Sequence, residues 1–177
     1  MSKNRTVLKI VSLLTFTAFI ATFAYSVYHK PETKLVETNI KIDTAEPTAT
    51  LRDSLIDYGT TFLGTPYVTA GCSKDGFDCS GFVYFVFKHY DIEVPRSSSG
   101  FANFGTEIPI EEVQKGDILV FLSPTRNAIG HVGIVSNPKG KESDFIHASS
   151  SKEMKVVITS LLKEGYKRRF IKAVRVL

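Results

Sequence analysis

The chain has 177 residues, of which 43% are apolar and 23% charged, so it can form a folded core and is not disordered throughout. Its formal net charge is +4, but Lys3, Arg5 and Lys9 precede an apolar segment, and subtracting these three charges leaves +1 for the rest. So small a charge gives no support for a nucleic-acid partner.

Residues 10–28 contain no charged side chain. As a helix they would be about 28 Å long, close to the ~30 Å hydrocarbon core of a bilayer. Residues 1–29 therefore resemble an export signal, either a signal peptide that is removed or an N-terminal anchor that stays in the inner membrane. We expect an exported protein of the periplasm or cell envelope. Residues 30–49 are polar and contain Pro31 and Pro47, which predicts a linker.

Residues 50–177 form the expected domain. Thr50 and Asp53 resemble a capping box at the start of a first helix, and the loop from Gly64 to Phe77 is expected to be irregular. Asp78 is a good N-cap for a second helix that runs to Tyr90. A turn at Pro95 to Ser99 precedes a short third helix. Helices followed by strands predict an α+β fold with an antiparallel sheet; the expected strands are 118–122, 131–136, 144–148, 155–159 and 170–176.

Cys79 stands in the first turn of the second predicted helix, where unpaired N–H groups and the positive end of the dipole favour a thiolate. Gly81 would let a substrate backbone approach this turn. His131 lies at the start of a strand between glycines that leave its ring room, and we expect it to be the base. His147 would hold the other ring nitrogen and fix the tautomer.

Other interpretations of these residues stay open. Cys72 and Cys79 could form a disulfide in an oxidising compartment, although a short bridge would add little to a domain with its own core. Each histidine alone could be a core residue. Two cysteines and two histidines could also bind zinc, but their spacing is longer than that of typical ligand pairs, so we expect no metal.

Six short segments together resemble the NlpC-type cell-wall cysteine peptidases over about residues 51–177. The resemblance implies a circularly permuted papain-like α+β fold. The apolar helix expected from residues 10–28 precedes this fold, and the expected chemistry needs no cofactor. It also implies hydrolysis of peptidoglycan stem peptides, often between D-glutamate and a diamino acid. The segments that carry it are Gly64-Thr65-Pro66-Tyr67, Gly76 to Gly81, Pro95 to Ser98, Gly116 to Phe121, Gly130 to Ile134 and His147-Ala148.

The resemblance also assigns roles to single residues. Cys79 matches the nucleophile, His131 the base and His147 the third polar member, while Tyr67 matches a tyrosine that helps to bind the oxyanion. Asp78 and Ser80 match positions that in some members bind the free amine of a short stem peptide. This chain departs from the family at Phe101, near a common glutamine, and at Ala70-Gly71, where Gly-Gly is usual.

The sequence therefore predicts a monomeric cysteine endopeptidase that hydrolyses peptidoglycan stem peptides through a Cys-His-His triad. Two alternatives remain, namely amidase or acyltransferase chemistry on the same scaffold, and a non-catalytic wall-binding module. Reversible capping of Cys79 by Cys72 is a third, regulatory possibility. A membrane contact is expected only through residues 1–29, if these are not removed.

Overall fold

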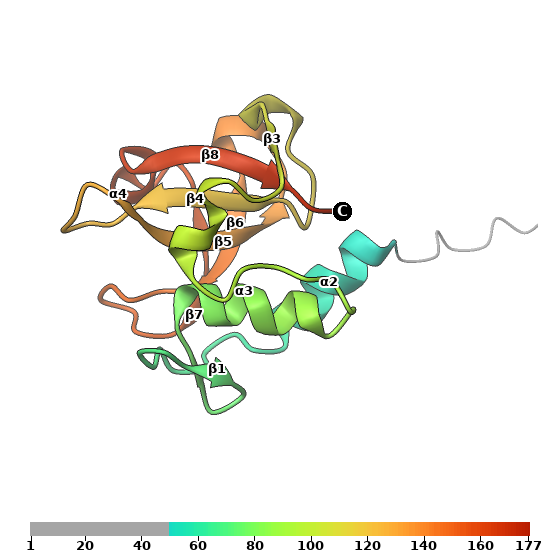
Figure 1. The fold of residues 1–177 in the computed structure, drawn as a ribbon, viewed down its shortest axis with the longest axis vertical. Coiled ribbons are helices and arrows are strands. Elements are labelled where there is room, and N and C mark those ends of the chain that lie inside the picture. Colours follow the sequence, from blue (N-terminus) through green and yellow to red (C-terminus); the bar gives the residue numbers. More distant parts are fainter. Residues whose placement is uncertain (1–49) are drawn as a thin grey trace, which may run out of the picture. The chain divides into compact units, whose positions relative to one another are not determined.

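The computed structural model describes residues 50–177 (Figure 1). The export signal expected at residues 1–29 and the linker expected at 30–49 lie outside this range. Among the described residues, no helix has both the length and the apolar character needed to cross a bilayer.

Two ten-residue helices precede most of the sheet. Helix α2 spans Leu51–Thr60 and begins at the predicted capping box, in which the Thr50 side chain accepts from the Asp53 amide and the Asp53 carboxylate accepts from the Thr50 amide. Helix α3 spans Cys79–Lys88. The short helices are η1 (Ser98–Ala102), η2 (Ile110–Glu112), η3 (Gly140–Glu142) and α4 (Glu164–Lys167).

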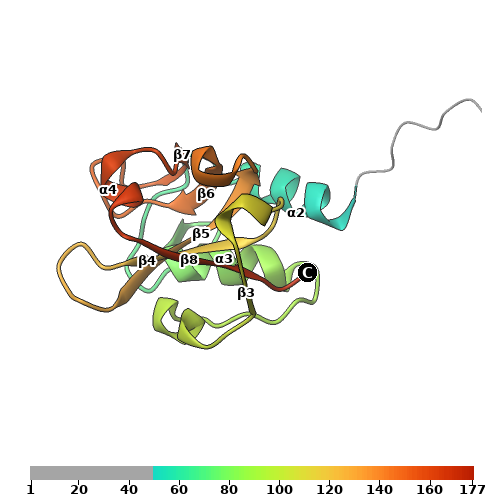
Figure 2. The same ribbon diagram turned by 90° about the horizontal axis from the view of Figure 1, so that it is seen from above.

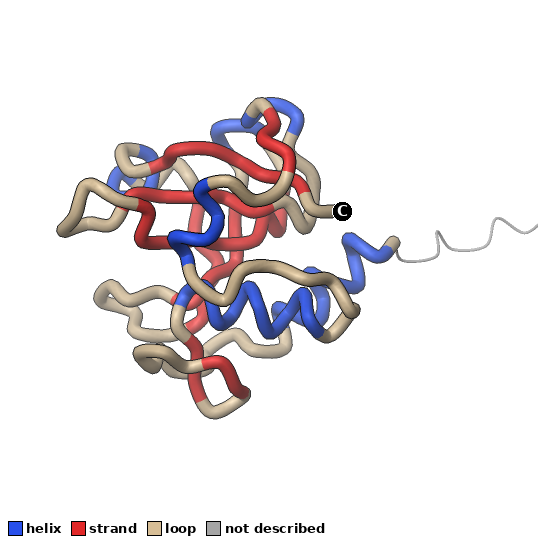
Figure 3. The backbone as a smooth tube through the Cα atoms, in the orientation of Figure 1, coloured by secondary structure: helices blue, strands red, loops and turns tan. Residues whose placement is uncertain are grey.

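Six antiparallel strands form the main sheet, in the order β3-β8-β4-β5-β6-β7. The strands are drawn in red in Figure 3. A separate two-stranded hairpin, β1 (Cys72–Ser73) and β2 (Gly76–Phe77), precedes α3. The strands of the main sheet are β3 (Thr106–Ile108), β4 (Ile118–Leu122), β5 (Ile129–Asn137), β6 (Asp144–Ala148), β7 (Val156–Ser160) and β8 (Phe170–Arg175).

The sheet is covered on one face by α2 and α3, as Figures 1 and 2 show from two directions. The core on this side joins buried side chains of α3, such as Phe82 and Val86, to Val132 and Ile146 of the sheet. A second, smaller core lies on the opposite face and includes Phe121, Phe145 and Tyr166. Since side chains alternate along a strand, neighbouring residues of β5 enter different cores.

The predicted α+β class and antiparallel sheet are confirmed, with β4 and β6 at their predicted bounds. The prediction of an irregular loop from Gly64 to Phe77 was wrong, because backbone pairing between Cys72 and Phe77 makes a hairpin there. The short third helix is a 3₁₀ helix, η1. Strand β3 and helix α4 were not predicted, since each has fewer than five residues and little periodicity.

Candidate active site

The predicted nucleophile opens helix α3. The Asp78 carboxylate caps the helix by accepting from the Gly81 amide at 2.6 Å, which places Cys79 at the first helical position. The Cys79 side chain is 8% exposed, and its Sγ lies 3.8 Å from the carbonyl oxygen of Gly130. The amide of Val132 also faces the sulfur. The sulfur therefore contacts the backbone of β5 on both sides of His131.

Three adjacent strands supply a line of polar side chains. His131 of β5 and His147 of β6 face each other, with 2.9 Å between His131 Nε2 and His147 Nδ1. His147 Nε2 lies 3.1 Å from Oγ1 of Thr159 on β7. Both rings are buried, and Tyr166 and Phe145 pack against them. The nitrogen of His131 that remains for the sulfur is Nδ1, the one nearer the backbone.

Burial controls the pKa values of the nucleophile and the imidazoles. It raises the pKa of the Cys79 thiol, the Asp78 charge raises it further, and the amides of Val132, Ser80 and Cys79 oppose both. Burial, followed by the positive charge of Arg169, lowers the pKa of His131 to about 3. Burial also lowers the pKa of His147, helped by its neighbour His131.

These pKa shifts favour an uncharged Cys79–His131 pair over the thiolate expected from the sequence. Burial disfavours the charged form of both groups, since it raises the pKa of the Cys79 thiol and lowers that of the His131 imidazole. Both shifts act in the same direction, toward a thiol and a neutral imidazole in the free protein.

A cavity of about 460 Å³ opens over Cys79. Tyr67 lines it, and burial, followed by the nearby charges of Cys79 and Asp78, raises the pKa of the Tyr67 phenol. A raised pKa keeps this hydroxyl protonated, so that it can donate a hydrogen bond into the cavity. The other lining residues are Thr69, Ala70, Asp78, Ser80, Arg96, Ser97, Ser98 and Gly130.

Asp78 has an internal cation as its partner. Arg96 donates from Nη1 to Asp78 Oδ1 and from Nη2 to Asp78 Oδ2, each at 3.0 Å, and Ser80 donates to Oδ1 at 3.2 Å. Arg96 also donates to the carbonyl oxygens of Ala70 and Gly71. The charge of Asp78 is thus already matched, so the expected binding of a substrate ammonium by Asp78 and Ser80 would compete with Arg96.

Two expectations about glycines need correction. A Cβ at Gly81 would overlap the carbonyl oxygen of Gly71, so this glycine makes room for the chain's own loop and not for a substrate. A Cβ at Gly133 would lie 2.5 Å from Phe145 Cδ2 and 3.0 Å from His147 Cβ. Gly133 therefore admits the side chains of β6 beside His131.

Both cysteines are free thiols. The Cys72 thiol lies 3.6 Å from the Gly81 carbonyl oxygen, whereas Cys79 faces β5. His89, which follows the last turn of α3, is exposed and stacks on Tyr58 with ring centroids 3.8 Å apart.

Sequence reasoning gave no role to Thr159, Arg96 or Tyr166. Thr159 is a polar residue in a strand-like apolar run, and Arg96 belongs to a segment that carried the family resemblance. The sequence did not show that Thr159 contacts His147 or that Arg96 binds Asp78. The sheet register brings the first pair together, and the path of the loop after α3 brings the second pair together.

Comparison with known proteins finds relatives that align with most of this chain. The model of the NlpC/P60 family matches residues 64–175. A gamma-D-glutamyl-L-lysine dipeptidyl-peptidase of Bacillus cereus is 36% identical over 126 residues, which cover 71% of this chain and 36% of that protein. A probable endopeptidase of Haemophilus influenzae is 36% identical over 141 residues, covering 78% of this chain and 82% of that protein.

Solved structures show the same fold. A crystal structure of an NlpC/P60 family protein from Bacillus cereus has a TM-score of 0.64 and 34% identity, and covers 73% of this chain and 41% of its own. The NlpC/p60 domain of peptidoglycan hydrolase SagA has a TM-score of 0.57 at 26% identity, with 71% of this chain and 99% of that domain covered. The aligned part of the chain spans little more than a third of the two Bacillus dipeptidyl-peptidases, 36% and 38%. With 112 of its 177 residues inside the family model and this fold around Cys79, the chain belongs to the NlpC/P60 family.

Proposed function

We propose that this protein is a cysteine endopeptidase that hydrolyses peptide bonds in peptidoglycan stem peptides, with Cys79 as nucleophile and His131 as base. The observation that carries the proposal is the placement of the Cys79 sulfur against the backbone on both sides of His131, whose Nε2 is held by His147. The names of the relatives, an endopeptidase and a gamma-D-glutamyl-L-lysine dipeptidyl-peptidase, support the substrate class.

The positions of the protons on His131 and His147 decide whether His131 can act as a base. If His147 donates from Nε2–H to Thr159 Oγ1, its Nδ1 accepts from His131 Nε2–H. His131 Nδ1 then carries a lone pair toward the sulfur. In the opposite arrangement His131 Nδ1 would hold a proton and could not act as a base, so we assign the first arrangement to the active protein.

In the acylation step, His131 Nδ1 takes the thiol proton while Cys79 Sγ attacks the amide carbonyl carbon. The carbonyl oxygen becomes an oxyanion, which the Cys79 backbone N–H and the Tyr67 hydroxyl stabilise as hydrogen-bond donors. The tetrahedral intermediate collapses as His131 returns the proton to the leaving amine. A thioester on Cys79 and a free amine result.

In the deacylation step, His131 removes a proton from water, and the resulting hydroxide attacks the thioester carbonyl. The C–S bond breaks, the thiolate takes back the proton from His131, and a carboxylic acid leaves. The cycle ends with the uncharged pair that the pKa shifts favour at rest.

We place the scissile bond between D-glutamate and the diamino acid, on the strength of the named activity of the Bacillus relative. The test is to incubate the full chain with defined muropeptides and to weigh the products. Cleavage at this bond yields a new amine on the diamino acid. A new amine elsewhere would instead identify an amidase, and a transferred acyl group would identify an acyltransferase.

A matched pair of variants tests the nucleophile. Cys79→Ala should abolish cleavage, and Cys72→Ser should retain it, because only Cys79 faces β5. Circular dichroism of both variants controls for folding. Turnover by Cys79→Ala at the wild-type rate would refute the assignment, and absence of turnover by the wild type on every muropeptide would favour a binding module.

We further propose that residues 1–29 direct the domain to the outer side of the cytoplasmic membrane, where the wall polymer lies. A reporter that is active only outside the cytoplasm, fused after residue 49, should give a signal. Loss of the signal when residues 1–29 are removed would support the proposal, and a cytoplasmic reporter signal from the full segment would contradict it.

A further inference from the structure

Tyr166 of α4 packs against both histidines of the proposed triad. The centroid of its ring lies 5.7 Å from that of His131 and 5.1 Å from that of His147. The Tyr166 side chain is 4% exposed, and its ring also meets Phe121 and Phe145 edge to face. Because a protein interior has few voids, a displaced Tyr166 ring would leave both imidazoles free to move.

Arg169 follows α4, and its side chain lies over the Tyr166 ring. The guanidinium carbon is 5.0 Å from the ring centroid, within the range of a cation–π contact. Arg169 Nε donates to the carbonyl oxygen of Gly165 at 2.7 Å, and Arg169 Nη1 donates to that of Leu122 at 2.8 Å. The guanidinium group therefore joins α4, the Tyr166 ring and the end of β4.

The end of β4 that Arg169 binds is the end that pairs with His131. The Leu122 amide donates to the Arg169 carbonyl oxygen at 2.8 Å, so these two residues are joined through main chain and side chain. Phe121 lies opposite His131, and the pairing of β4 with β5 and with β8 is irregular on either side of Phe121. The contacts of Arg169 thus fix the sheet where its regular hydrogen bonding is interrupted.

The charge of Arg169 has no carboxylate partner. Among the residues that the structure describes, no carboxylate oxygen lies within 4.0 Å of its guanidinium nitrogens. Lys163 also lies over the Tyr166 ring, at 5.9 Å from the centroid, but it pairs with the Glu153 carboxylate at 2.8 Å. The positive charge that remains beside the histidines is therefore that of Arg169.

This charge acts on His131 together with burial. Burial is the larger cause that lowers the pKa of His131, and the charge of Arg169 lowers it further. The titratable groups that surround His131 come from several elements, namely Cys79 of α3, His147 of β6, Tyr166 of α4, and Lys163 and Arg169 at the two ends of α4.

We propose that Arg169 is a positioning residue, which holds both imidazoles in place through Tyr166 and whose charge keeps His131 in the uncharged form that accepts the thiol proton. This inference rests on the proposed function and adds a residue to it. Arg169 does not line the cavity over Cys79, so it acts on the base and not on the substrate.

The kinetic test at pH 7 measures the placement of the base, because burial alone keeps His131 uncharged at this pH. Arg169→Gln should lower kcat for the cleaved muropeptide by about tenfold, since a small displacement of a base lowers the rate steeply, and KM should stay within about twofold. Arg169→Lys should recover part of the lost kcat. Arg169→Met gives the same comparison should Arg169→Gln not fold, which circular dichroism shows.

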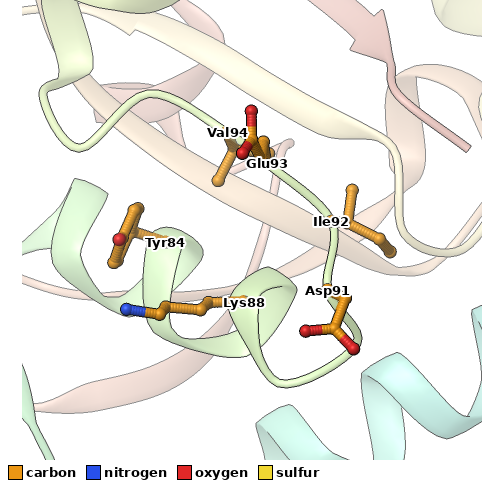
Figure 4. A pocket seen from close by; sticks show the side chains of 6 residues that line it. All are labelled: Tyr84, Lys88, Asp91, Ile92, Glu93 and Val94. Carbon is orange, nitrogen blue, oxygen red and sulfur yellow. The ribbon is translucent and has the colours of Figure 1, made fainter.

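Lys88→Gln is the matched control, because Lys88 also lies over a tyrosine ring, 5.4 Å from the centroid of Tyr84. That pair lines a hollow of about 620 Å³ (Figure 4), which has no lining residue in common with the cavity over Cys79. Lys88→Gln should keep the wild-type kcat. Equal kcat values for Arg169→Gln and Lys88→Gln would overturn the proposal.

A double-mutant cycle at pH 7 tests whether Arg169 acts through the ring. Tyr166→Leu removes the ring that the guanidinium group contacts. In this background Arg169→Gln should lower kcat by less than about twofold, because the route by which it acts is already broken. A tenfold loss in both backgrounds would contradict action through Tyr166.

The effect of the charge can be measured without turnover, by following the ¹⁵N chemical shifts of the His131 ring from pH 4 to 8. A unit charge roughly 10 Å away shifts a pKa by about one unit at an effective dielectric constant of 20. Loss of this positive charge raises the pKa of His131, so its protonation in Arg169→Gln should begin about one pH unit higher than in the wild type. Arg169→Lys and Lys88→Gln should titrate as the wild type does.

An unchanged titration in Arg169→Gln would refute the role of the charge. If the wild type cleaves no muropeptide, the proposed function fails alone, while this titration still decides whether Arg169 controls the charge of His131.

Discussion

The pKa shifts of Cys79 and His131 favour an uncharged pair in the free protein, and the pH dependence of thiol reactivity tests this. Because burial raises the thiol pKa and lowers the imidazole pKa, the thiolate fraction grows only as pH approaches the raised thiol pKa. The rate of alkylation of Cys79 by iodoacetamide should therefore rise about tenfold per pH unit from pH 6 to 9. The measurement is a second-order rate constant at each pH.

The control is a Cys72→Ser background, in which Cys79 is the only thiol that can be labelled. A thiolate–imidazolium pair would behave differently, because its sulfur is already charged at neutral pH. A rate that is flat between pH 5 and 8 would thus contradict the uncharged pair.

Thr159 positions His147, and its effect should be visible in turnover but not in folding. Thr159→Val keeps the shape of the side chain and removes the hydroxyl that lies 3.1 Å from His147 Nε2, the group that accepts from it in the arrangement we assign. We expect kcat to fall by roughly tenfold, because the proton pattern that leaves His131 Nδ1 free is no longer favoured. KM for the same muropeptide should stay within about twofold.

Thr159→Ser retains the hydroxyl and should restore most of the lost kcat. If Thr159→Val and Thr159→Ser lowered kcat equally, the methyl group and its packing, rather than the hydrogen bond, would explain the loss.

The sequence predicts a site residue well when its contacts are with neighbours in the chain, and poorly when its partners are distant in sequence. The N-cap at Asp78 and the helix-opening position of Cys79 depend on neighbouring residues and are confirmed. The closeness of His131 and His147, also expected, follows from the pairing of β5 with β6. Thr159 and Arg96 find their partners across 12 and 18 residues, through register and loop path, and no local pattern encodes these.

At the scale of elements, the start of α3 is packed against the loop that precedes it. The amide of Asp78 donates to the Gly71 carbonyl oxygen, and a Cβ at Gly81 would overlap that oxygen. Gly81→Ala must therefore move either the helix or the loop, and we expect a loss of about 1–3 kcal/mol in the free energy of unfolding. Urea denaturation measures the loss.

Gly165→Ala is the matched control, because this glycine also lies in a helix, α4, and a Cβ there meets no atom within 4 Å. Its stability should stay the same or increase slightly, as alanine is the better helix former. If Gly81→Ala were as stable as Gly165→Ala, the close packing at the start of α3 would not constrain the helix.

At the scale of the described domain, one buried carboxylate joins its two ends. Asp117, just before β4, has a fully buried side chain and binds Arg52 of α2 at 3.1 Å and Arg175 of β8 at 2.7 Å. Arg52 also donates to the carbonyl oxygen of Leu177. The first helix and the last strand are thus held to the central strands, and neither contact could be foreseen from segments more than 50 residues apart.

Asp117→Ala should destabilise the whole domain while leaving the active site of the folded molecules intact. Removing this carboxylate leaves two arginines without their buried partner, which costs about 3 kcal/mol, whereas Lys115→Ala breaks only the exposed contact with Asp53 and should cost far less. Urea midpoints measure both effects. Asp117 precedes the end of β4 that pairs with Ile134, whereas His131 pairs with Phe121 near the other end. The alkylation rate of Cys79 in folded Asp117→Ala should consequently equal that of the wild type, and a changed rate would mean that this ion-pair cluster also shapes the catalytic pair.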